Sequence, residues 1–341
     1  MNFLILLGVI AAIMVAFRLM NILNISQELS GRDATEELHK DVKGNAMGLI
    51  AFMVVGLILF FYMIWKYMPL TLPVAASEHG VRTDNLLNIN FYIIIFVFII
   101  TQIALFYFIW KYQYRKGHMA YFYSHNNTVE IIWTVIPTIV LAILVITGLK
   151  EWIAITSKDN TDGMNVQVYA QQFVFLGRYA GRDNTLGDSY FRNISTENPL
   201  GLKLEDKAVN DDIIAKTEMH FPVNTPIMLN INSRDIIHSV YMPHFRVQMN
   251  AVPGMTTNFY FKPTITTAEM RKKTANEKFD YVILCNKICG VSHYTMNMKV
   301  VVDSKEDFVK WLKTQPLAKP APTADNANAS QTVKEIAEAV K

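Results

Sequence analysis

The sequence predicts a membrane-anchored α + β protein, with four transmembrane helices followed by a β-sandwich or barrel. The chain of 341 residues is 51% hydrophobic and its mean hydropathy is +0.19, which is high for a soluble protein. Charged residues are sparse before residue 150, outside short connecting segments, and frequent after it. Long apolar runs give way to short β-rich segments near residue 164. The net charge of +3 is small and gives no reason to expect a nucleic-acid partner.

The helical half contains four apolar segments, at 3–17, 46–65, 89–110 and 131–149. The last three carry no charge, and each is long enough to cross a hydrocarbon core of ~30 Å as a helix. The first is shorter, so a signal peptide is the alternative. It lacks a charged leading region and a cleavage site of small residues, and we therefore expect a retained helix that runs to about Asn24.

The charges of the connecting segments predict the orientation. Segments 18–45 and 111–127 are rich in lysine and arginine, whereas Arg82 is the single basic residue of 68–88. Basic loops stay in the cytoplasm, so the N-terminus and everything after Lys150 should lie outside. Aromatic residues stand at the predicted helix ends, as expected at membrane interfaces: Tyr62, Trp65, Tyr67, Trp110 and Trp152.

The outer half is predicted to be β-rich. The segments "NVQVYAQ", "PIMLNINS", "TNFYFK", "YVILC" and "MKVVVD" are rich in Val, Ile, Tyr and Phe and are separated by turn residues. A closing helix is predicted in "SKEDFVKWLK", where Ser304 is the cap and Phe308, Trp311 and Leu312 form one face. We expect a loop at 180–214 and a flexible tail from 315 to 341.

The two cysteines of the chain stand in "CNKICGVSHYTM", from Cys285 to Met296. A disulfide is the usual state of a lone cysteine pair in an exported domain. However, the stretch also holds His293 and Met296, and thiolates together with a thioether favour copper over hard ions. Zinc accepts two cysteines and a histidine but has no use for the methionine.

A further histidine ligand is needed for such a site, and His238 is the best candidate among the eight histidines. It lies in "SRDIIHSVYMP", at the end of a β-rich run and upstream of the cysteine loop. His220 and His244 are interpreted as surface or internally bonded histidines. The other upstream histidines fall in or near the connecting segments of the membrane half: His39, His79, His118 and His125.

These two motifs, "DIIHSVYMP" followed by "AVPG" and "CNKICGVSHYTM", resemble the copper-binding pattern of subunit II of haem–copper cytochrome c oxidases. The segment "VEIIWTVIPTIVLAIL" (129–144) resembles the second membrane helix of the same subunit. The order of parts is also the family's: a helix hairpin, an outer domain, and a cysteine loop near the end. The resemblance covers about 89–314, and it implies a cupredoxin-like fold for the outer domain.

The resemblance implies a binuclear copper centre, CuA. The implied ligands are two bridging thiolates, two imidazoles, a weakly bound thioether and a weakly bound backbone carbonyl: Cys285, Cys289, His238, His293, Met296 and Lys287. Such a subunit accepts electrons from a c-type cytochrome and passes them to haem in subunit I, where oxygen is reduced and protons are pumped. The chain itself would carry no catalytic residue.

The sequence departs from the family's pattern at a magnesium site that is shared with the catalytic subunit. The family usually has glutamate where this chain has Lys287, and aspartate where it has Asn250. An ordinary magnesium site is therefore doubtful. The family's tryptophan pair on the surface where electrons enter corresponds to Phe173 and Phe175 in "QQFVFLGRY", and Phe173 is our candidate for the contact with the donor haem. A core aromatic residue is the alternative for that position.

Glu130 begins the last membrane helix. It is either a favourable partner of the helix dipole or, as the resemblance implies, the carboxylate at the mouth of the proton path into subunit I. The predicted organisation has extra N-terminal helices over 1–88, the family's hairpin over 89–151, and a periplasmic domain over 152–314. Subunits I and III, a donor cytochrome and membrane lipids are the expected partners, and the extra helices suggest a supercomplex with a quinol-oxidising complex. The expected location is the bacterial inner membrane.

Three other functions share part of this pattern. A quinol oxidase subunit II keeps the fold but loses the copper ligands, which are all present here. A nitrous oxide reductase carries a similar copper loop but needs a large histidine-rich catalytic domain and no helix hairpin. A membrane-anchored structural zinc or thiol module without electron transfer is the principal alternative, and His238 and Met296 count against it.

Overall fold

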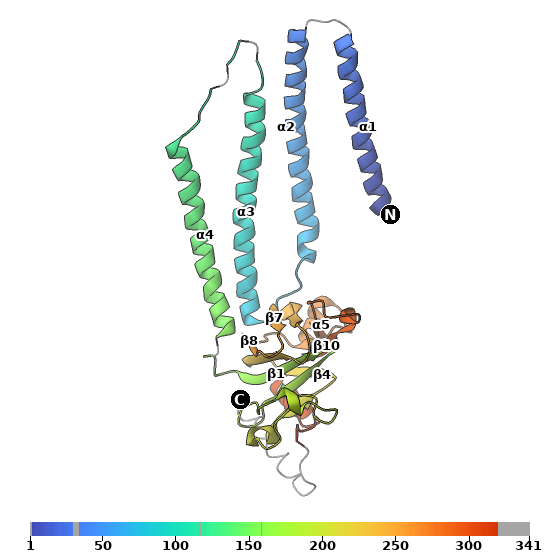
Figure 1. Cartoon of the computed structure of the whole chain (residues 1–341), viewed down its shortest axis with the longest axis vertical. Coiled ribbons are helices and arrows are strands. Elements are labelled where there is room, and N and C mark those ends of the chain that lie inside the picture. Colours follow the sequence, from blue (N-terminus) through green and yellow to red (C-terminus); the bar gives the residue numbers. More distant parts are fainter. Residues whose placement is uncertain (1, 30–33, 116, 120, 158, 320–341) are drawn as a thin grey trace. The chain divides into compact units, whose positions relative to one another are not determined.

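The computed structural model describes residues 2–29, 34–115, 117–119, 121–157 and 159–319. The chain divides into two compact units, which are described separately: residues 1–69 with 92–132, and residues 70–91 with 133–341. The long helices are α1 (Asn2–Leu29), α2 (Ala34–Tyr67), α3 (Glu78–Lys111) and α4 (Asn127–Thr156) (Figure 1).

Three helical segments among the described residues are long and apolar enough to cross a membrane. They are Asp41–Leu70, Glu78–Lys111 and Asn127–Thr156. A shorter apolar helix covers Ala11–Ser26. Large apolar side chains along these segments are exposed; for example, Phe52 is 68% exposed and Ile131 is 61% exposed. Such surfaces need a lipid or protein partner. The three long spans confirm the prediction, whereas a fourth, formed by α1, stays a prediction.

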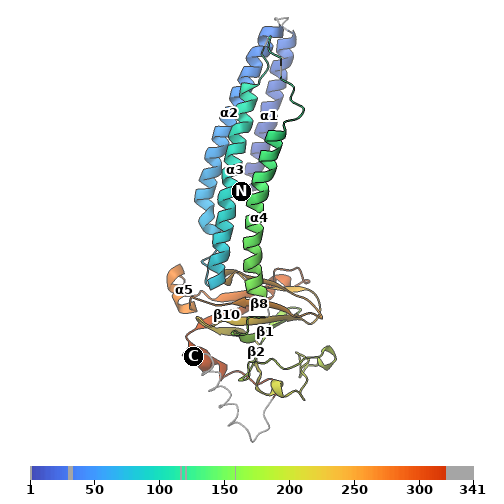
Figure 2. The same cartoon turned by 90° about the vertical axis from the view of Figure 1, so that its left-hand side faces the viewer.

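The β-rich half folds as a cupredoxin-like sandwich of two five-stranded sheets (Figure 2). The first sheet has the order β3 (Ile213–Ala215), β2 (Val174–Tyr179), β1 (Met164–Gln171), β5 (Ile227–Ser233) and β8 (Thr257–Phe261). The second has the order β4 (Glu218–Pro222), β10 (Asn297–Asp303), β9 (Tyr281–Leu284), β6 (His238–Met242) and β7 (Val247–Ala251). The pairs β1–β5 and β10–β4 are parallel and the other paired strands are antiparallel.

The core lies between the sheets and is built from alternating strand residues. In β1, Val166, Val168 and Ala170 are fully buried, and in β10 Val300 and Val302 are at most 1% exposed. This period of two places one face of each strand against the opposite sheet. The cysteine loop belongs to the same cluster, because Cys285, Cys289 and Met296 are buried within it.

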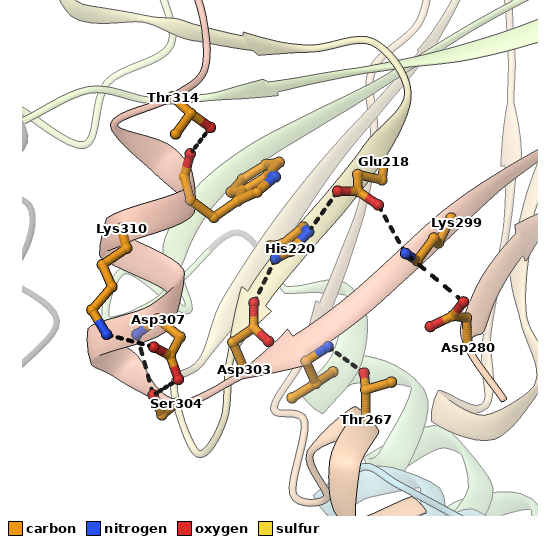
Figure 3. A network of polar contacts seen from close by, with 12 residues as sticks. Glu218, His220, Thr267, Asp280, Lys299, Asp303, Ser304, Asp307, Lys310 and Thr314 are labelled. Atoms are coloured by element: carbon orange, nitrogen blue, oxygen red, sulfur yellow. Dashed lines mark hydrogen bonds and ion pairs between the residues drawn. The ribbon is translucent and has the colours of Figure 1, made fainter. Parts of the chain in front are cut away.

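The closing helix is confirmed as α6 (Lys305–Leu312). The Ser304 hydroxyl accepts a hydrogen bond from the Asp307 N–H, and Phe308 and Leu312 are buried. Trp311 stacks on the His220 ring with centroids 4.0 Å apart. Figure 3 shows His220 between the carboxylates of Glu218 and Asp303, which are 3.2 and 2.5 Å from Nε2 and Nδ1. His220 is thus an internally bonded histidine, as predicted.

Residues just before α3 and in its first turns complete the base of the sandwich. The Ala76 N–H donates to the His244 carbonyl at 2.7 Å, and the Ala76 carbonyl accepts from the Thr264 N–H at 2.8 Å. The Arg246 guanidinium forms two hydrogen bonds with the Asp84 carboxylate, at 2.7 and 2.8 Å. Since Ala76 is fully buried, this segment, residues 73–84, is part of the domain core. We call it the base segment.

Several local elements differ from the sequence-based expectations. Residues 180–214 are mostly irregular, as expected, but they cover a second apolar cluster around Leu200, Leu202 and Val209. A capped helix, α5 (Thr267–Thr274), was not predicted, because Met270 is its one large apolar residue and the segment therefore shows no apolar face. Residues 315–319 continue the domain, since the Ile214 N–H donates to the Pro316 carbonyl and the Ala318 N–H to the Asp212 carbonyl. The rest of the expected tail, 320–341, lies outside the described residues.

Candidate metal centre

The two predicted motifs meet at one end of the sandwich. His238 is the first residue of β6. The loop between β9 and β10 carries Cys285 and Cys289, and its last turn is a short 3-10 helix from His293 to Thr295, directly before Met296. The backbone N–H of Cys285 donates to the Met296 carbonyl at 3.1 Å, which closes the base of the loop. Sequence separation therefore does not prevent the six candidate donors from converging.

The donors form two sets, one around each sulfur. The Cys285 Sγ lies 3.8 Å from the His238 Nδ1 and 3.2 Å from the Lys287 carbonyl oxygen. The Cys289 Sγ lies 3.4 Å from the His293 Nδ1 and 3.8 Å from the Met296 Sδ. The two sulfurs are 3.8 Å apart. Each thiol thus has one imidazole and one weak donor beside it.

These separations match the distances between ligands of a shared metal ion. Thiolate sulfur and imidazole nitrogen bind zinc at about 2.3 and 2.0 Å, so two such ligands at a tetrahedral angle lie about 3.5 Å apart and two sulfurs about 3.8 Å apart. His238, Cys285 and Cys289 also form a group in which the donor atoms all lie within 4.8 Å of one another. The cysteines are free thiols, so both sulfurs are available as ligands.

The site is almost closed to solvent. His238 is fully buried, Cys289 and Met296 are each 1% exposed, and Cys285 is 8% exposed. Burial and, to a smaller extent, the neighbouring Cys285 thiol together raise the pKa of the Cys289 thiol to about 11. A cation is the natural counterpart of two adjacent buried sulfurs, because it stabilises both thiolates at neutral pH.

Asp235 and Gln172 form hydrogen bonds with the candidate ligand residues His238 and Cys289. Neither residue was identified from the sequence. The Asp235 carboxylate lies 2.8 Å from the His238 Nε2 and accepts a hydrogen bond from the Gln172 N–H at 2.8 Å. This contact fixes which ring nitrogen of His238 is free for a metal. The Gln172 side-chain N–H donates to the Cys289 carbonyl at 2.7 Å. The spacing of Asp235 three residues before His238, within the same quoted motif, was the available signal.

The structure separates the two aromatic residues that were predicted where electrons enter. Phe173 stands in the turn between β1 and β2, and its ring lies against Gly290 of the cysteine loop. A Cβ added to Gly290 would meet the Phe173 ring at 3.0 Å, and the φ of +134° at Gly290 is also unfavourable for other residues. Phe175 is 1% exposed within the core, so it offers no surface to a partner.

The positions of the altered magnesium site are on the surface. Lys287 directs its backbone carbonyl to Cys285, while its side chain is exposed. Asn250 in β7 is also exposed, and its carbonyl accepts a hydrogen bond from the Thr257 hydroxyl at 2.7 Å. The two side chains bring one positive charge and no carboxylate to the surface.

Glu130 lies in the first turn of α4, as expected. Its carboxylate accepts a long hydrogen bond of 3.4 Å from the Asn126 N–H, and the Asn126 side chain accepts one from the Val129 N–H. This pattern is that of a helix cap. Trp133 and Pro137 follow within the same helix, which continues without interruption to Thr156.

Comparison with known proteins identifies the family. Residues 65–150 match the family model "Cytochrome C oxidase subunit II, transmembrane domain", and residues 164–304 match "Cytochrome C oxidase subunit II, periplasmic domain". An alternative cytochrome c oxidase subunit 2 of Bradyrhizobium diazoefficiens is 31% identical over 79% of this chain and 92% of its own length. A cytochrome c oxidase subunit 2 of Thermostichus vulcanus is 26% identical, over 74% of this chain and 80% of its own length.

Among solved structures, the periplasmic domain of subunit II of cytochrome oxidase of Bradyrhizobium japonicum matches 44% of this chain and 91% of its own, with 18% identity and a TM-score of 0.29. The two family models together cover most of the chain, from the end of the second predicted span to the last strand. The chain therefore belongs to the cytochrome c oxidase subunit II family, as a membrane-anchored oxidase subunit with a periplasmic domain.

Proposed function

We propose that this chain is the electron-transfer subunit of a proton-pumping cytochrome c oxidase and that its donors hold a binuclear CuA centre. The observation that carries the proposal is the division of the donors into two sets joined by a sulfur–sulfur separation of 3.8 Å. A single tetrahedral zinc ion would need four of the six donors and would leave the thioether and the carbonyl without a role. A pair of copper ions would give all six donors a role.

When bound, the copper pair would supply one-electron transfer between a c-type cytochrome and haem in subunit I. The contribution of this chain is a rigid frame. His238 is held by Asp235, the loop backbone is held by Gln172, and the sulfurs are buried in the core cluster. A frame that changes little between the two oxidation states keeps the reorganisation on electron transfer small.

The surface where electrons enter is proposed at Phe173. Its ring packs against the backbone of the cysteine loop at Gly290, so a donor haem that contacts Phe173 would lie close to the sulfurs. We include no magnesium ion in the proposal, because Lys287 and Asn250 provide no carboxylate there.

The membrane arrangement is also part of the proposal. We infer four spans, with α1 as the fourth, in the inner membrane of a bacterium. Residues 1–88 would contact further subunits, 89–151 would bind subunit I, and 152–314 would lie in the periplasm. Glu130 would lie at the mouth of the proton path, since a carboxylate at the cytoplasmic end of a span is accessible to protons from that side.

Copper content and electron paramagnetic resonance of the purified full chain test the copper proposal. We expect about two copper ions per chain and one unpaired electron shared equally between them. The variant Cys289→Ser should lose this signal, whereas Thr295→Ser, a matched change of an exposed loop hydroxyl, should keep it. One zinc ion per chain, or two thiols joined in a disulfide with no metal, would overturn the proposal and favour a membrane-anchored zinc or thiol module.

A further inference from the structure

A second candidate site lies at the outer ends of two membrane-crossing helices. A cavity of about 320 Å³ is enclosed by the first turns of α3, the last turn of α4, the segment that leads into β1, and β8. Its lining includes the apolar residues Ile155 and Phe261. It also includes four charged residues, namely Glu78, Arg82, Asp162 and Lys262. The volume is that of a small-ligand site.

The two cations of the lining, Arg82 and Lys262, retain unused hydrogen-bond donors. The Lys262 Nζ forms an ion pair with the Glu78 carboxylate at 2.7 Å. The Arg82 guanidinium donates from Nη1 to Glu78 at 3.2 Å and from Nε to Glu151 at 3.0 Å. An ammonium has three N–H groups and a guanidinium five, so both cations retain donors after these contacts. Together they can bind an oxyanion without losing their carboxylate partners.

The Asp162 carboxylate of the lining retains an unused acceptor. The Tyr260 hydroxyl donates to the Asp162 Oδ2 at 3.1 Å, which leaves the other carboxylate oxygen for a ligand. Burial raises the pKa of Tyr260 to about 12, and the hydrogen bond with Asp162 contributes to the shift, so the hydroxyl remains a donor at neutral pH. Asp162 itself is exposed, which makes it accessible from outside.

His79 provides independent support for a ligand. It lines the cavity and is 3% exposed. Its Nε2 lies 3.4 Å from the Arg246 carbonyl, but its Nδ1 is buried and has no hydrogen-bond partner within the part of the chain that the structure describes. A buried polar atom without a partner costs roughly 1–3 kcal/mol, and a bound ligand with an N–H group would remove this cost.

The location of the cavity indicates the class of ligand. The spans Glu78–Lys111 and Asn127–Thr156 begin and end at its walls. Trp152 and Ile153 on the last turns of α4 are 52% and 54% exposed, so apolar surface continues directly from the cavity. Residues at the end of a span lie at the depth of lipid headgroups, where tryptophan is enriched. A ligand with a polar head and apolar chains matches these surroundings.

We propose that this cavity binds the phosphoethanolamine headgroup of a zwitterionic phospholipid of the outer leaflet. The phosphate would accept hydrogen bonds from Lys262 and Arg82. The primary ammonium would donate to Asp162 and to the Nδ1 of His79. The acyl chains would lie along the exposed apolar side of α4. This site is independent of the copper centre and would exist whether or not copper is bound.

Native mass spectrometry of the full chain, released from bilayers of stated composition, tests the proposal. The bilayers contain phosphatidylethanolamine, its N-methyl and N,N-dimethyl derivatives, phosphatidylcholine or phosphatidylglycerol. We expect one retained phosphatidylethanolamine per chain and similar retention of the N-methyl lipid, which still has two N–H donors. Retention should fall with the N,N-dimethyl lipid, which has one, and again with phosphatidylcholine, which has none. Between phosphatidylethanolamine and phosphatidylcholine the loss should be at least about tenfold, because the choline lipid can donate neither to Asp162 nor to the His79 Nδ1.

Two variants separate the cavity from the general lipid surface. Asp162→Asn keeps an oxygen for Tyr260 but removes the charge, and it should abolish the preference for ethanolamine over choline. Asp159→Asn is the matched control, since Asp159 is an exposed acid in the same segment that does not line the cavity, and it should keep the preference. The melting temperature of each variant, followed by tryptophan fluorescence, shows whether it is folded.

The remaining outcomes decide between sources of the ligand. Displacement of the lipid by millimolar glycerophosphoethanolamine would support recognition through the headgroup. Equal retention of the ethanolamine and choline lipids would show that the retained molecule is an adventitious lipid only, and it would overturn the proposal. Preferred retention of phosphatidylglycerol would show an anion site instead, and binding of glycerophosphoethanolamine without any retained lipid would exclude the membrane as the source.

Discussion

At the scale of single residues, Asp235 is the group on which the geometry of the candidate metal centre depends most. Its carboxylate accepts hydrogen bonds from the Gln172 and Ile236 N–H groups and lies 2.8 Å from the His238 Nε2. We expect Asp235→Asn to lower copper affinity by about 10- to 100-fold, because the amide no longer fixes the orientation and tautomer of the ring. Competition with a copper chelator measures the affinity.

The matched control for this prediction is Asp280→Asn. Asp280 is also a half-buried carboxylate, but it pairs with Arg271 at 2.7 Å and lies outside the candidate centre. This variant should bind copper as the original chain does. An Asp235→Asn chain with unchanged affinity and an unchanged resonance spectrum would show that His238 is oriented by packing alone.

A second residue-scale prediction concerns the buried ion pair of Arg178 and Asp212, whose side chains are 3.1 Å apart and at most 3% exposed. Burial raises the pKa of Asp212 to about 6, although Arg178 opposes the shift. In the unfolded chain this carboxyl has a pKa of about 3.9. The folded state therefore binds the extra proton between about pH 4 and pH 6, and its free energy of unfolding should fall as the pH rises through this window.

The size of this effect is on the order of 2–3 kcal/mol, because one pKa unit corresponds to about 1.4 kcal/mol. Thermal unfolding of the full chain between pH 4 and pH 7 measures it. Asp212→Asn should lower stability, because it leaves the buried Arg178 without a charge partner, and it should also flatten the pH profile over this range. If Asp212→Asn keeps the original dependence of stability on pH, other titratable groups cause that dependence.

At the scale of elements, the base segment makes the stability of the sandwich depend on residues at the start of the third helix and just before it. Arg246 holds this segment through Asp84 and also donates to the Pro73 carbonyl at 2.7 Å. We expect Arg246→Met to cost about 2 kcal/mol, as the loss of charge-assisted hydrogen bonds in a partly buried site does. The melting temperature of the full chain should fall by roughly 4–8 °C.

Arg234→Met is the control for this prediction, because Arg234 is an exposed arginine whose guanidinium donates to the Gln171 side chain. A second comparison uses the periplasmic residues alone. A fragment of residues 152–319 should melt at a lower temperature than the same fragment mixed with a peptide of residues 70–91. If the peptide has no effect and Arg246→Met is as stable as the control, the base segment does not contribute to domain stability.

How far the sequence predicts these elements depends on how local the relevant interactions are. The strands around Val168 and Val300 alternate over several residues, and the copper motif is contiguous from Cys285 to Met296, so both were predicted. Phe173 and Phe175 were both expected on the surface where electrons enter, with Phe173 as the contact residue, because they correspond to the family's tryptophan pair. The turn between β1 and β2 contains Phe173, and the alternation begins only after it.

Non-local interactions could not be predicted in the same way. The Ser77 hydroxyl donates a hydrogen bond to the Phe245 carbonyl, 168 residues further along the chain. The residues around Ser77 and those around Phe245 contain no pattern that indicates this contact. Residues 78–88 were expected in a loop for this reason. They extend α3 to Glu78, because tertiary contacts with the sandwich override the weak local signal.

At the scale of the whole molecule, the distribution of charge predicts how a soluble donor would associate. The segment 180–214 carries acidic residues that could attract a basic cytochrome: Asp183, Asp188, Glu205 and Asp211. If the donor is soluble, the rate of electron transfer to the copper-loaded chain should fall as the ionic strength rises from about 0.01 to 0.15 M, where the screening length decreases from about 30 to 8 Å. Stopped-flow absorbance measures this rate.

The variant Asp188→Asn/Glu205→Gln should flatten the salt dependence without changing the copper content. Glu306→Gln is the control, since Glu306 is an exposed acid on α6 outside this segment. A rate that is independent of salt in the original chain would favour a donor that is permanently attached in the membrane, for which steering by charge is unnecessary.

The base segment also has a consequence for biogenesis. Residues 73–84 leave the ribosome long before the strands that they complete, because Phe245 follows Ser77 by 168 residues. Once the second and third helices are inserted, this short piece is already on the outer side of the membrane. The later strands, delivered by translocation, then fold onto a template that is already tethered. Maturation of the thiol loop would thus await correct insertion, and chains with misinserted helices would expose an incomplete domain to periplasmic proteases.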